Sequence, residues 1–124
     1  MSRSKVVFSI IPMVMLAGCA GHQEKYSWGN YDPSLYDYYK SPAKVGELVT
    51  SLQASIDAAS AHGQPTPPGI RAEYGYLLLQ QGKAPEAVAQ FQSEERAWPE
   101  SKVFMDHMIK VASSDQTVAE SKSP

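Results

Sequence analysis

The chain of 124 residues contains a single cysteine, Cys19, so an intramolecular disulfide is excluded. It also lacks an excess of either charge, with 11 basic and 13 acidic side chains and a net charge of −2. Such a balance gives no electrostatic footprint for nucleic acid or for anionic lipid. Runs of alternating apolar and polar residues, which are typical of half-buried strands, are absent. We therefore expect a helical protein that binds no nucleic acid.

Motifs for catalysis and metal binding are missing as well. His22, His62 and His107 lie far apart and form no Asp/Glu/Cys/His cluster at metal-ligand spacing. There is no G-x-S-x-G sequence, phosphate-binding glycine loop or HExxH motif. The adjacent carboxylates Glu94 and Glu95 would point about 100° apart on a helix, so we expect them on a solvated face. The sequence predicts no enzymatic activity and no cofactor.

The first 18 residues have the features of a secretory signal peptide. Arg3 and Lys5 form a charged start, and an apolar run follows from Val6 to Leu16. This run is shorter than the roughly 20 apolar residues that a helix needs to cross a bilayer. The small residues Ala17 and Gly18 then precede Cys19, as a peptidase cleft requires.

The sequence Leu16-Ala17-Gly18-Cys19 resembles the lipobox of bacterial lipoproteins. The resemblance implies cleavage before Cys19, a diacylglycerol thioether on its sulfur, and acylation of the new amine by a chain such as palmitate. Three acyl chains exceed the two signals that suffice for stable membrane anchoring. Ala20, in place of an aspartate, implies transfer to the outer membrane by resemblance to the enterobacterial sorting rule. We expect the domain on the periplasmic face of that membrane. A lone free thiol is the alternative for Cys19.

The rest of the chain is expected to form one all-α domain at 26–113, between a lipidated tether at 19–25 and a disordered tail at 114–124. Proline and glycine mark the helix boundaries. The predicted helices are Pro33–Lys40 with Asp32 as N-cap, 43–62, Ile70–Gln81, 83–97 and Glu100–Ala112.

Apolar residues at helical spacing predict which faces are buried. In the helix at 43–62 these residues form one apolar stripe, and we expect Ser51 and Ser55 to lie off it. The expected inner residues of the five helices are Leu35, Val45, Leu48, Val49, Leu52, Ile56, Ala59, Ile70, Tyr74, Leu77, Leu78, Ala87, Val88, Phe91, Phe104, Met108 and Val111.

The stretch from Pro68 to Pro99 resembles one tetratricopeptide repeat, a helix pair of about 34 residues. The matching positions are Gly75, Gly82, Ala87, Phe91 and Pro99, whereas Arg71, Leu78 and Glu94 depart from the pattern. The resemblance implies that Gly75 faces Ala87 at a close helix crossing and that a concave face can bind a peptide. An ordinary helical bundle is the alternative.

The aromatic stretch from Tyr26 to Lys40 and the turn Gly82-Lys83-Ala84-Pro85-Glu86-Ala87 resemble a bacterial lipoprotein family, domain of unknown function 4810. The resemblance implies that the protein is encoded beside lipoproteins related to the curli secretion-channel subunit. It implies no chemical activity. We expect a protein-interaction or assembly accessory of a cell-envelope complex, whose candidate partner-binding residues are Tyr38, Tyr74 and Trp98.

The alternative function is binding of peptidoglycan or exopolysaccharide by the N-terminal aromatic residues, which are Trp28, Tyr31, Tyr36, Tyr38 and Tyr39. A simpler account is that Trp28, Leu35, Tyr36 and Tyr39 cover the first long helix, since each aromatic ring buries about 150–250 Å².

Overall fold

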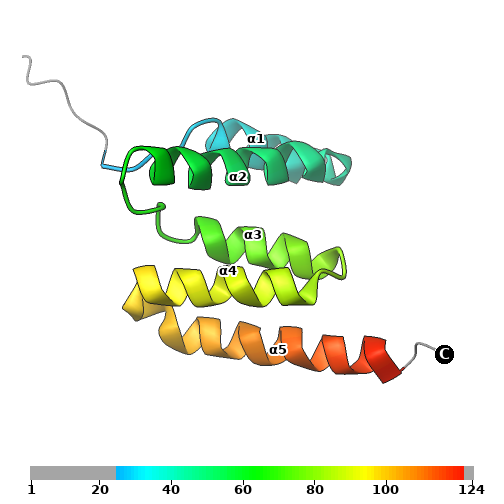
Figure 1. Ribbon diagram of the computed structural model, residues 1–124. Coiled ribbons are helices and arrows are strands. Elements are labelled where there is room, and N and C mark those ends of the chain that lie inside the picture. The colour runs from blue at the N-terminus through cyan, green and yellow to red at the C-terminus, as the bar shows by residue number, and fades with distance from the viewer. Residues whose placement is uncertain (1–24, 122–124) are drawn as a thin grey trace, which may run out of the picture.

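The structure, a computed structural model, describes the backbone of residues 25–121 and the side chains as far as Asp115. The signal peptide, Cys19 and the tether before Lys25 lie outside the described residues. The described chain is all-α and contains no strand. Its elements are α1 (Tyr31–Lys40), η1 (Pro42–Lys44), α2 (Val45–Ala61), α3 (Ile70–Gln80), α4 (Ala84–Ala97), η2 (Pro99–Ser101) and α5 (Lys102–Ser121), shown in Figure 1.

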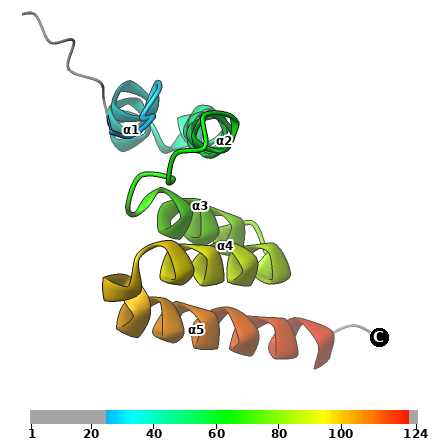
Figure 2. The same cartoon turned by 60° about the vertical axis from the view of Figure 1, so that its left-hand side comes forward.

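The helices follow one another through space in the order of the chain. Consecutive helices lie side by side and reverse direction at each connection, with α1 and α2 at one end of the array and α5 at the other (Figures 1 and 2). The ends of α2 and α3 lie where the glycines predict, because Gly63 and Gly82 have positive φ angles of 61° and 75°. The predicted all-α class is confirmed.

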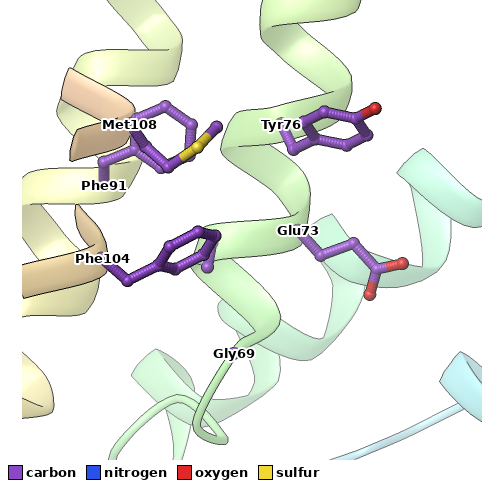
Figure 3. A pocket seen from close by; sticks show the side chains of 7 residues that line it. Gly69, Glu73, Tyr76, Phe91, Phe104 and Met108 are labelled. Carbon is purple, nitrogen blue, oxygen red and sulfur yellow. The ribbon is translucent and has the colours of Figure 1, made fainter. Parts of the chain in front are cut away.

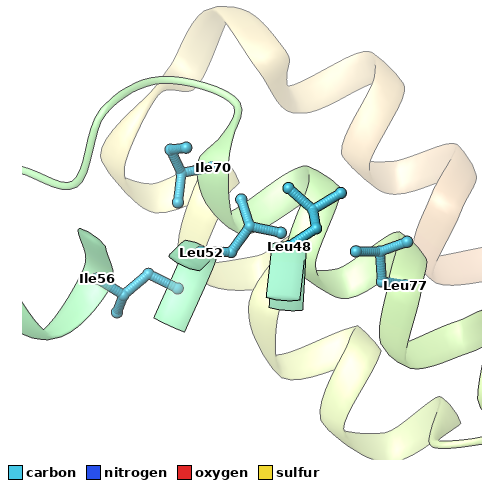
Figure 4. Close-up of a cluster of buried hydrophobic side chains, with 5 residues drawn as sticks. All are labelled: Leu48, Leu52, Ile56, Ile70 and Leu77. Carbon is cyan, nitrogen blue, oxygen red and sulfur yellow. The ribbon is translucent and has the colours of Figure 1, made fainter. Parts of the chain in front are cut away.

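Two apolar clusters hold the array together, one on each side of α3. The first joins α2 to α3 and consists of Leu48, Leu52, Ile56, Ile70 and Leu77 (Figure 4). The second joins α3 and α4 to α5 and consists of Leu78, Ala87, Phe91, Met105 and Ala112. Tyr74 packs against both clusters. The stripe predicted for α2 is confirmed at its buried residues, and α3 is the helix that both clusters share.

The N-terminal segment covers α2, but with a different face of α1 than the sequence suggested. Tyr31, Leu35 and Tyr38 pack on the first cluster, at the spacing of one helix face. Tyr36 and Tyr39, expected to cover α2, are exposed instead. The same docking buries Ser51 and Ser55 on α2, which were expected off the stripe.

Hydrogen bonds explain why Ser55 can be buried and where α1 begins, whereas the Ser51 hydroxyl is buried without a hydrogen-bond partner. The Ser55 hydroxyl donates to the Trp28 carbonyl at 2.8 Å, so the covering segment satisfies it. The Ser34 N–H donates to the Asn30 carbonyl at 3.2 Å. The helix therefore starts at Tyr31 with Asn30 as N-cap, two residues earlier than the predicted Pro33 start after an Asp32 cap.

Helix α5 differs from its prediction in both phase and length. Met105 and Ala112 are buried, whereas Phe104, expected on the inner face, is exposed. The 3-10 turn η2 directly precedes α5 and contacts both α4 and α5. The helix also continues to Ser121, past the predicted end at Ala112. No glycine or proline interrupts 100–123, and the Ser113 hydroxyl bonds the Ile109 carbonyl within the helix.

Candidate interaction groove

An apolar pocket of about 370 Å³ opens on one face of the array, between α3 and α5. We call it the α3–α5 groove, and its lining residues are Gly69, Ala72, Glu73, Tyr76, Phe91, Phe104 and Met108 (Figure 3). Its size falls at the lower end of the range for ligand pockets, about 300–1,000 Å³. The lining surface is almost entirely apolar, and the Glu73 carboxylate is directed away from Phe104 and Met108 (Figure 3). The groove can therefore accept a small number of apolar side chains.

The walls of the groove come from helix faces that the core leaves uncovered. Ala72, Glu73 and Tyr76 share one face of α3, at helical spacing. Phe104 and Met108 share one face of α5, and Phe104 projects from α5 toward α3 (Figure 3). Phe104 is 61% exposed and Tyr76 is 48% exposed. Two large aromatic side chains at one pocket are an exposed apolar surface of the kind that marks interaction sites.

The floor of the groove is a fixed part of the core. Phe91 on α4 is fully buried and lies directly against Gly75. A Cβ at Gly75 would lie 2.6 Å from Phe91 Cε1, closer than real contacts allow. Gly75 is therefore a close crossing point of α3 and α4. The repeat resemblance placed Ala87 opposite Gly75, but the nearest atoms belong to Phe91. The pocket floor cannot deepen without displacing this ring.

The carboxylate of Glu73, whose side chain lies at the edge of the groove, is directed toward α1. The Tyr31 hydroxyl of α1 donates to Glu73 Oε2 at 2.7 Å. Burial, followed by this hydrogen bond, raises the pKa of the Tyr31 hydroxyl well above its usual range, and the nearby Asp32 adds to the effect. Tyr31 thus remains a neutral donor, and Glu73 is held in place as the acceptor.

A second carboxylate is buried where α3 begins. Glu94 is only 2% exposed, and its Oε1 accepts the Gly69 N–H at 2.6 Å. Burial raises the pKa of this carboxyl, while the N–H groups of Gly69, Arg71 and Ala72 oppose that rise. Oε2 is buried without a hydrogen-bond partner. The expected solvated face at Glu94 is wrong, because this side chain supplies the first orphan donor of α3 with an acceptor.

The three residues predicted to bind a partner are all engaged in packing. Tyr38 packs on the first cluster and Tyr74 on both clusters. Trp98 donates from Nε1 to the Thr66 carbonyl at 3.2 Å, and its ring meets Tyr26 edge-on at 5.9 Å. The structure does not bring Tyr38, Tyr74 and Trp98 together at one surface. The exposed aromatic residues at the groove are instead Tyr76, which the sequence analysis did not consider, and Phe104, which it assigned to the core.

The aromatic residues proposed for sugar binding are divided between packing and exposure. Trp28 and Tyr31 stack on each other with ring centroids 5.8 Å apart. They line a polar pocket of about 460 Å³ together with Gly29 and Asp32. On the exposed side of α1, the Lys40 ammonium lies 4.5 Å from the Tyr36 ring centre, and Tyr39 is 78% exposed.

Among the described side chains of residues 25–115, no group of three or more His, Cys, Asp or Glu could hold a metal ion. Within residues 25–121 no helix has the length and apolar character needed to cross a membrane. His62, directly after the end of α2, and His107, on α5, are both exposed.

The fold and the groove define a small all-α helical array with an apolar groove on one face. Over residues 25–108 the chain matches the family described as Domain of unknown function (DUF4810). The protein belongs to this family, as the resemblance of its aromatic stretch and its Gly82 turn predicted. The matched region includes every residue that lines the α3–α5 groove. Comparisons with curated proteins and with solved structures found no match.

Proposed function

We propose that this protein is a lipid-anchored docking module that holds another protein of the bacterial envelope through the α3–α5 groove. The observation that carries the proposal is the exposure of Phe104 and Tyr76 beside an apolar pocket. Leaving such rings in water forgoes about 1.5–3 kcal/mol for each large side chain that could be buried. A partner that covers the groove would gain this free energy.

The sequence around Cys19 supports the location of the module. A signal peptide followed by Leu16-Ala17-Gly18-Cys19 is the pattern of a lipoprotein held by acyl chains. The tether would place the helical array next to the membrane, and Ala20 favours the outer membrane. The resemblance to this family implies that the protein is encoded beside a lipoprotein related to the curli secretion-channel subunit. Such a lipoprotein is therefore the first candidate partner.

The helix pair α3–α4 supports a tetratricopeptide-like role. Gly75 and Phe91 meet at the close crossing, and Gly82 ends α3, at positions where such repeats place these residue types. Helices α2 and α5 cover the two sides of the pair. A groove between the first helices of successive pairs is a surface on which a peptide segment can lie.

Photo-crosslinking in intact cells tests the docking proposal. A photoreactive phenylalanine analogue is placed at Phe104 in the full-length chain and, as a matched control, at the neighbouring Val103. Val103 is 84% exposed but does not line the groove. We expect a discrete protein adduct from position 104 and none of that species from position 103. Equal adducts from both positions, or none, would refute the groove as the docking site.

The anchor is tested separately with Cys19→Ser. Without the thiol no thioether can form, so we expect a full-length, uncleaved precursor at the inner membrane. Normal processing of this variant would overturn the lipoprotein assignment. Membrane fractionation and mass spectrometry of the N-terminus measure both outcomes.

Glycan binding is the second candidate, and the pocket at Trp28, Tyr31 and Asp32 favours it because aromatic rings and a carboxylate meet there. Sedimentation with purified peptidoglycan sacculi tests this function. We expect Asp32→Asn to reduce co-sedimentation if the pocket binds sugar. Absence of the wild-type chain from the pellet would exclude the candidate.

A further inference from the structure

Helix α1 presents an exposed face on the side away from its packed residues. Tyr31, Leu35 and Tyr38 pack on the first cluster. The other side, which we call the α1 outer face, consists of the exposed residues Asp32, Pro33, Tyr36, Tyr39 and Lys40. Tyr36 is 57% exposed and Tyr39 is 78% exposed. These two rings, three residues apart on one helix face, form an apolar surface that the described chain does not cover.

Lysine side chains accompany tyrosine rings at this end of the molecule. The Lys40 ammonium lies 4.5 Å from the centre of the Tyr36 ring, and the Lys25 ammonium lies 5.2 Å from the centre of the Tyr26 ring. Among side chains 25–115, neither ammonium takes part in a salt bridge. Tyrosine rings with a free cation beside them are typical of a membrane–water interface, where the ring enters the headgroup region and the ammonium stays near water and phosphate.

The charges of the α1 outer face are nearly balanced. Asp32 is the carboxylate on this face, and it lies about two helical turns from Lys40. The net charge of the chain, −2, gives no general attraction to anionic lipid. A membrane contact of this face therefore depends mainly on the two rings, and Lys40 adds a local attraction to phosphate.

The length of chain before the array decides which surface the α1 outer face meets. Lys25 is six residues after Cys19, the proposed site of the lipid. Even a fully extended chain of that length spans only about 20 Å. The array therefore begins close to the bilayer in every anchored copy. Ring contacts of Trp28 with Tyr26 at 6.2 Å and with Tyr31 at 5.8 Å then hold the connection against the start of α1.

The remaining exposed large apolar side chains lie on other helices. Tyr76 is on α3, and Val103 and Phe104 are on α5. Helix α5 is at the opposite end of the array from α1 (Figures 1 and 2). Among the faces with exposed rings, the α1 outer face is therefore the one that the chain joins directly to the anchor. The anchor also keeps the bilayer at a high effective concentration, so two rings suffice for a contact that a free domain would make only weakly.

We propose that the α1 outer face lies on the surface of the membrane that holds Cys19. Tyr36 and Tyr39 enter the headgroup region, and the Lys40 ammonium lies near the lipid phosphates. Helix α5 then points away from the bilayer and leaves the α3–α5 groove open to a partner. This inference rests on the lipid anchor of the proposed function and adds the orientation of the array to it.

Photo-crosslinking of the full-length chain in intact cells tests this orientation. A photoreactive phenylalanine analogue at Tyr39 keeps an aromatic ring in place, and the same analogue at Val103 is the control at the other end of the array. Val103 is as exposed as Tyr39, at 84% against 78%. We expect mass spectrometry to find a phospholipid adduct at position 39 and none at position 103.

A second substitution measures the contribution of the neighbouring ring. Tyr36→Ser, combined with the analogue at position 39, should lower the yield of the lipid adduct about five- to tenfold. Tyr76→Ser is the matched control, because Tyr76 is similarly exposed, at 48%, but lies on α3. That variant should leave the yield unchanged. Circular dichroism of each variant verifies that the helical array is intact.

Three results would overturn the orientation while leaving the docking function in place. One is a lipid adduct of equal yield at positions 39 and 103, or none at position 39. Another is an equal yield in Tyr36→Ser and Tyr76→Ser. The third is capture of a protein or a glycan strand, in place of lipid, at position 39. The docking function fails on a different readout, the protein adduct at position 104, and the anchor fails on normal processing of Cys19→Ser, which would overturn the orientation as well.

Discussion

The close crossing of α3 and α4 at Gly75 gives a stability prediction that depends on one atom. Gly75→Ala adds a Cβ that would lie 2.6 Å from Cε1 and 2.9 Å from Cδ1 of Phe91. Favourable carbon–carbon separations are about 3.5–4.0 Å, so the ring or the helix must move by roughly 1 Å. Phe91 is fully buried and belongs to the second cluster, so a shift of its ring away from Gly75 disturbs the core packing.

The magnitude follows from two opposing effects. Alanine is favoured over glycine inside a helix by about 1 kcal/mol. Overpacking a close-packed core costs about 1–3 kcal/mol. We therefore expect Gly75→Ala to lower the free energy of unfolding by about 0–2 kcal/mol, even though the substitution improves helix propensity.

Gly46→Ala is the matched control, because Gly46 is exposed near the start of α2 and a Cβ there would meet nothing within 4 Å. That variant keeps the propensity gain, so Gly46→Ala should exceed Gly75→Ala in stability by about 1–3 kcal/mol. For a domain of this size each kcal/mol corresponds to about 4–8 °C in melting temperature. Urea and thermal unfolding, followed by circular dichroism of the soluble chain without the leader, measure the difference. Equal stabilisation by both variants would refute the close crossing.

Four further predictions concern buried or partly buried groups. Glu94→Ala removes the acceptor for the Gly69 N–H and should cost about 1–3 kcal/mol in urea unfolding; an unchanged midpoint would contradict the capping role. Burial raises the pKa of Glu94 above 4.5, so ionisation of this carboxyl opposes folding. The free energy of unfolding should therefore increase as pH falls through the raised pKa and become constant below 4.5. Glu94→Gln should remove this pH dependence, and a pH profile parallel to that of the wild type would show that another group is responsible. Trp98→Phe loses the bond from Nε1 to the Thr66 carbonyl and should cost about 0.5–1.5 kcal/mol in thermal unfolding; no loss would mean that the indole N–H finds water instead. Ala87→Leu should overfill the second cluster by about 1–3 kcal/mol, and an unchanged melting curve would contradict its complete burial.

The helices themselves could be predicted from the sequence because their signals are local. Apolar spacing at Leu48, Leu52 and Ile56 identified the buried stripe of α2, and Gly63 and Gly82 marked the ends of α2 and α3. Such features act within one or two helical turns, where hydrogen bonding and chain sterics do not depend on distant residues. The family was likewise recognisable from the aromatic stretch and the Gly82 turn.

The tertiary structure decided which apolar faces stay exposed. Phe104 and Met105 are neighbours in the chain, but adjacent positions on a helix point about 100° apart, and only the docking of α5 on α4 selects Met105 for the core. On α1, the docking on α2 likewise selects Tyr38 for packing and leaves Tyr36 exposed. Glu94 is buried where its carboxylate accepts the Gly69 N–H at the start of α3, and these two residues lie far apart in the chain. The sequence by itself thus determined the helices and the candidate anchor at Cys19, whereas the groove arises only where α3 and α5 are brought together on α4.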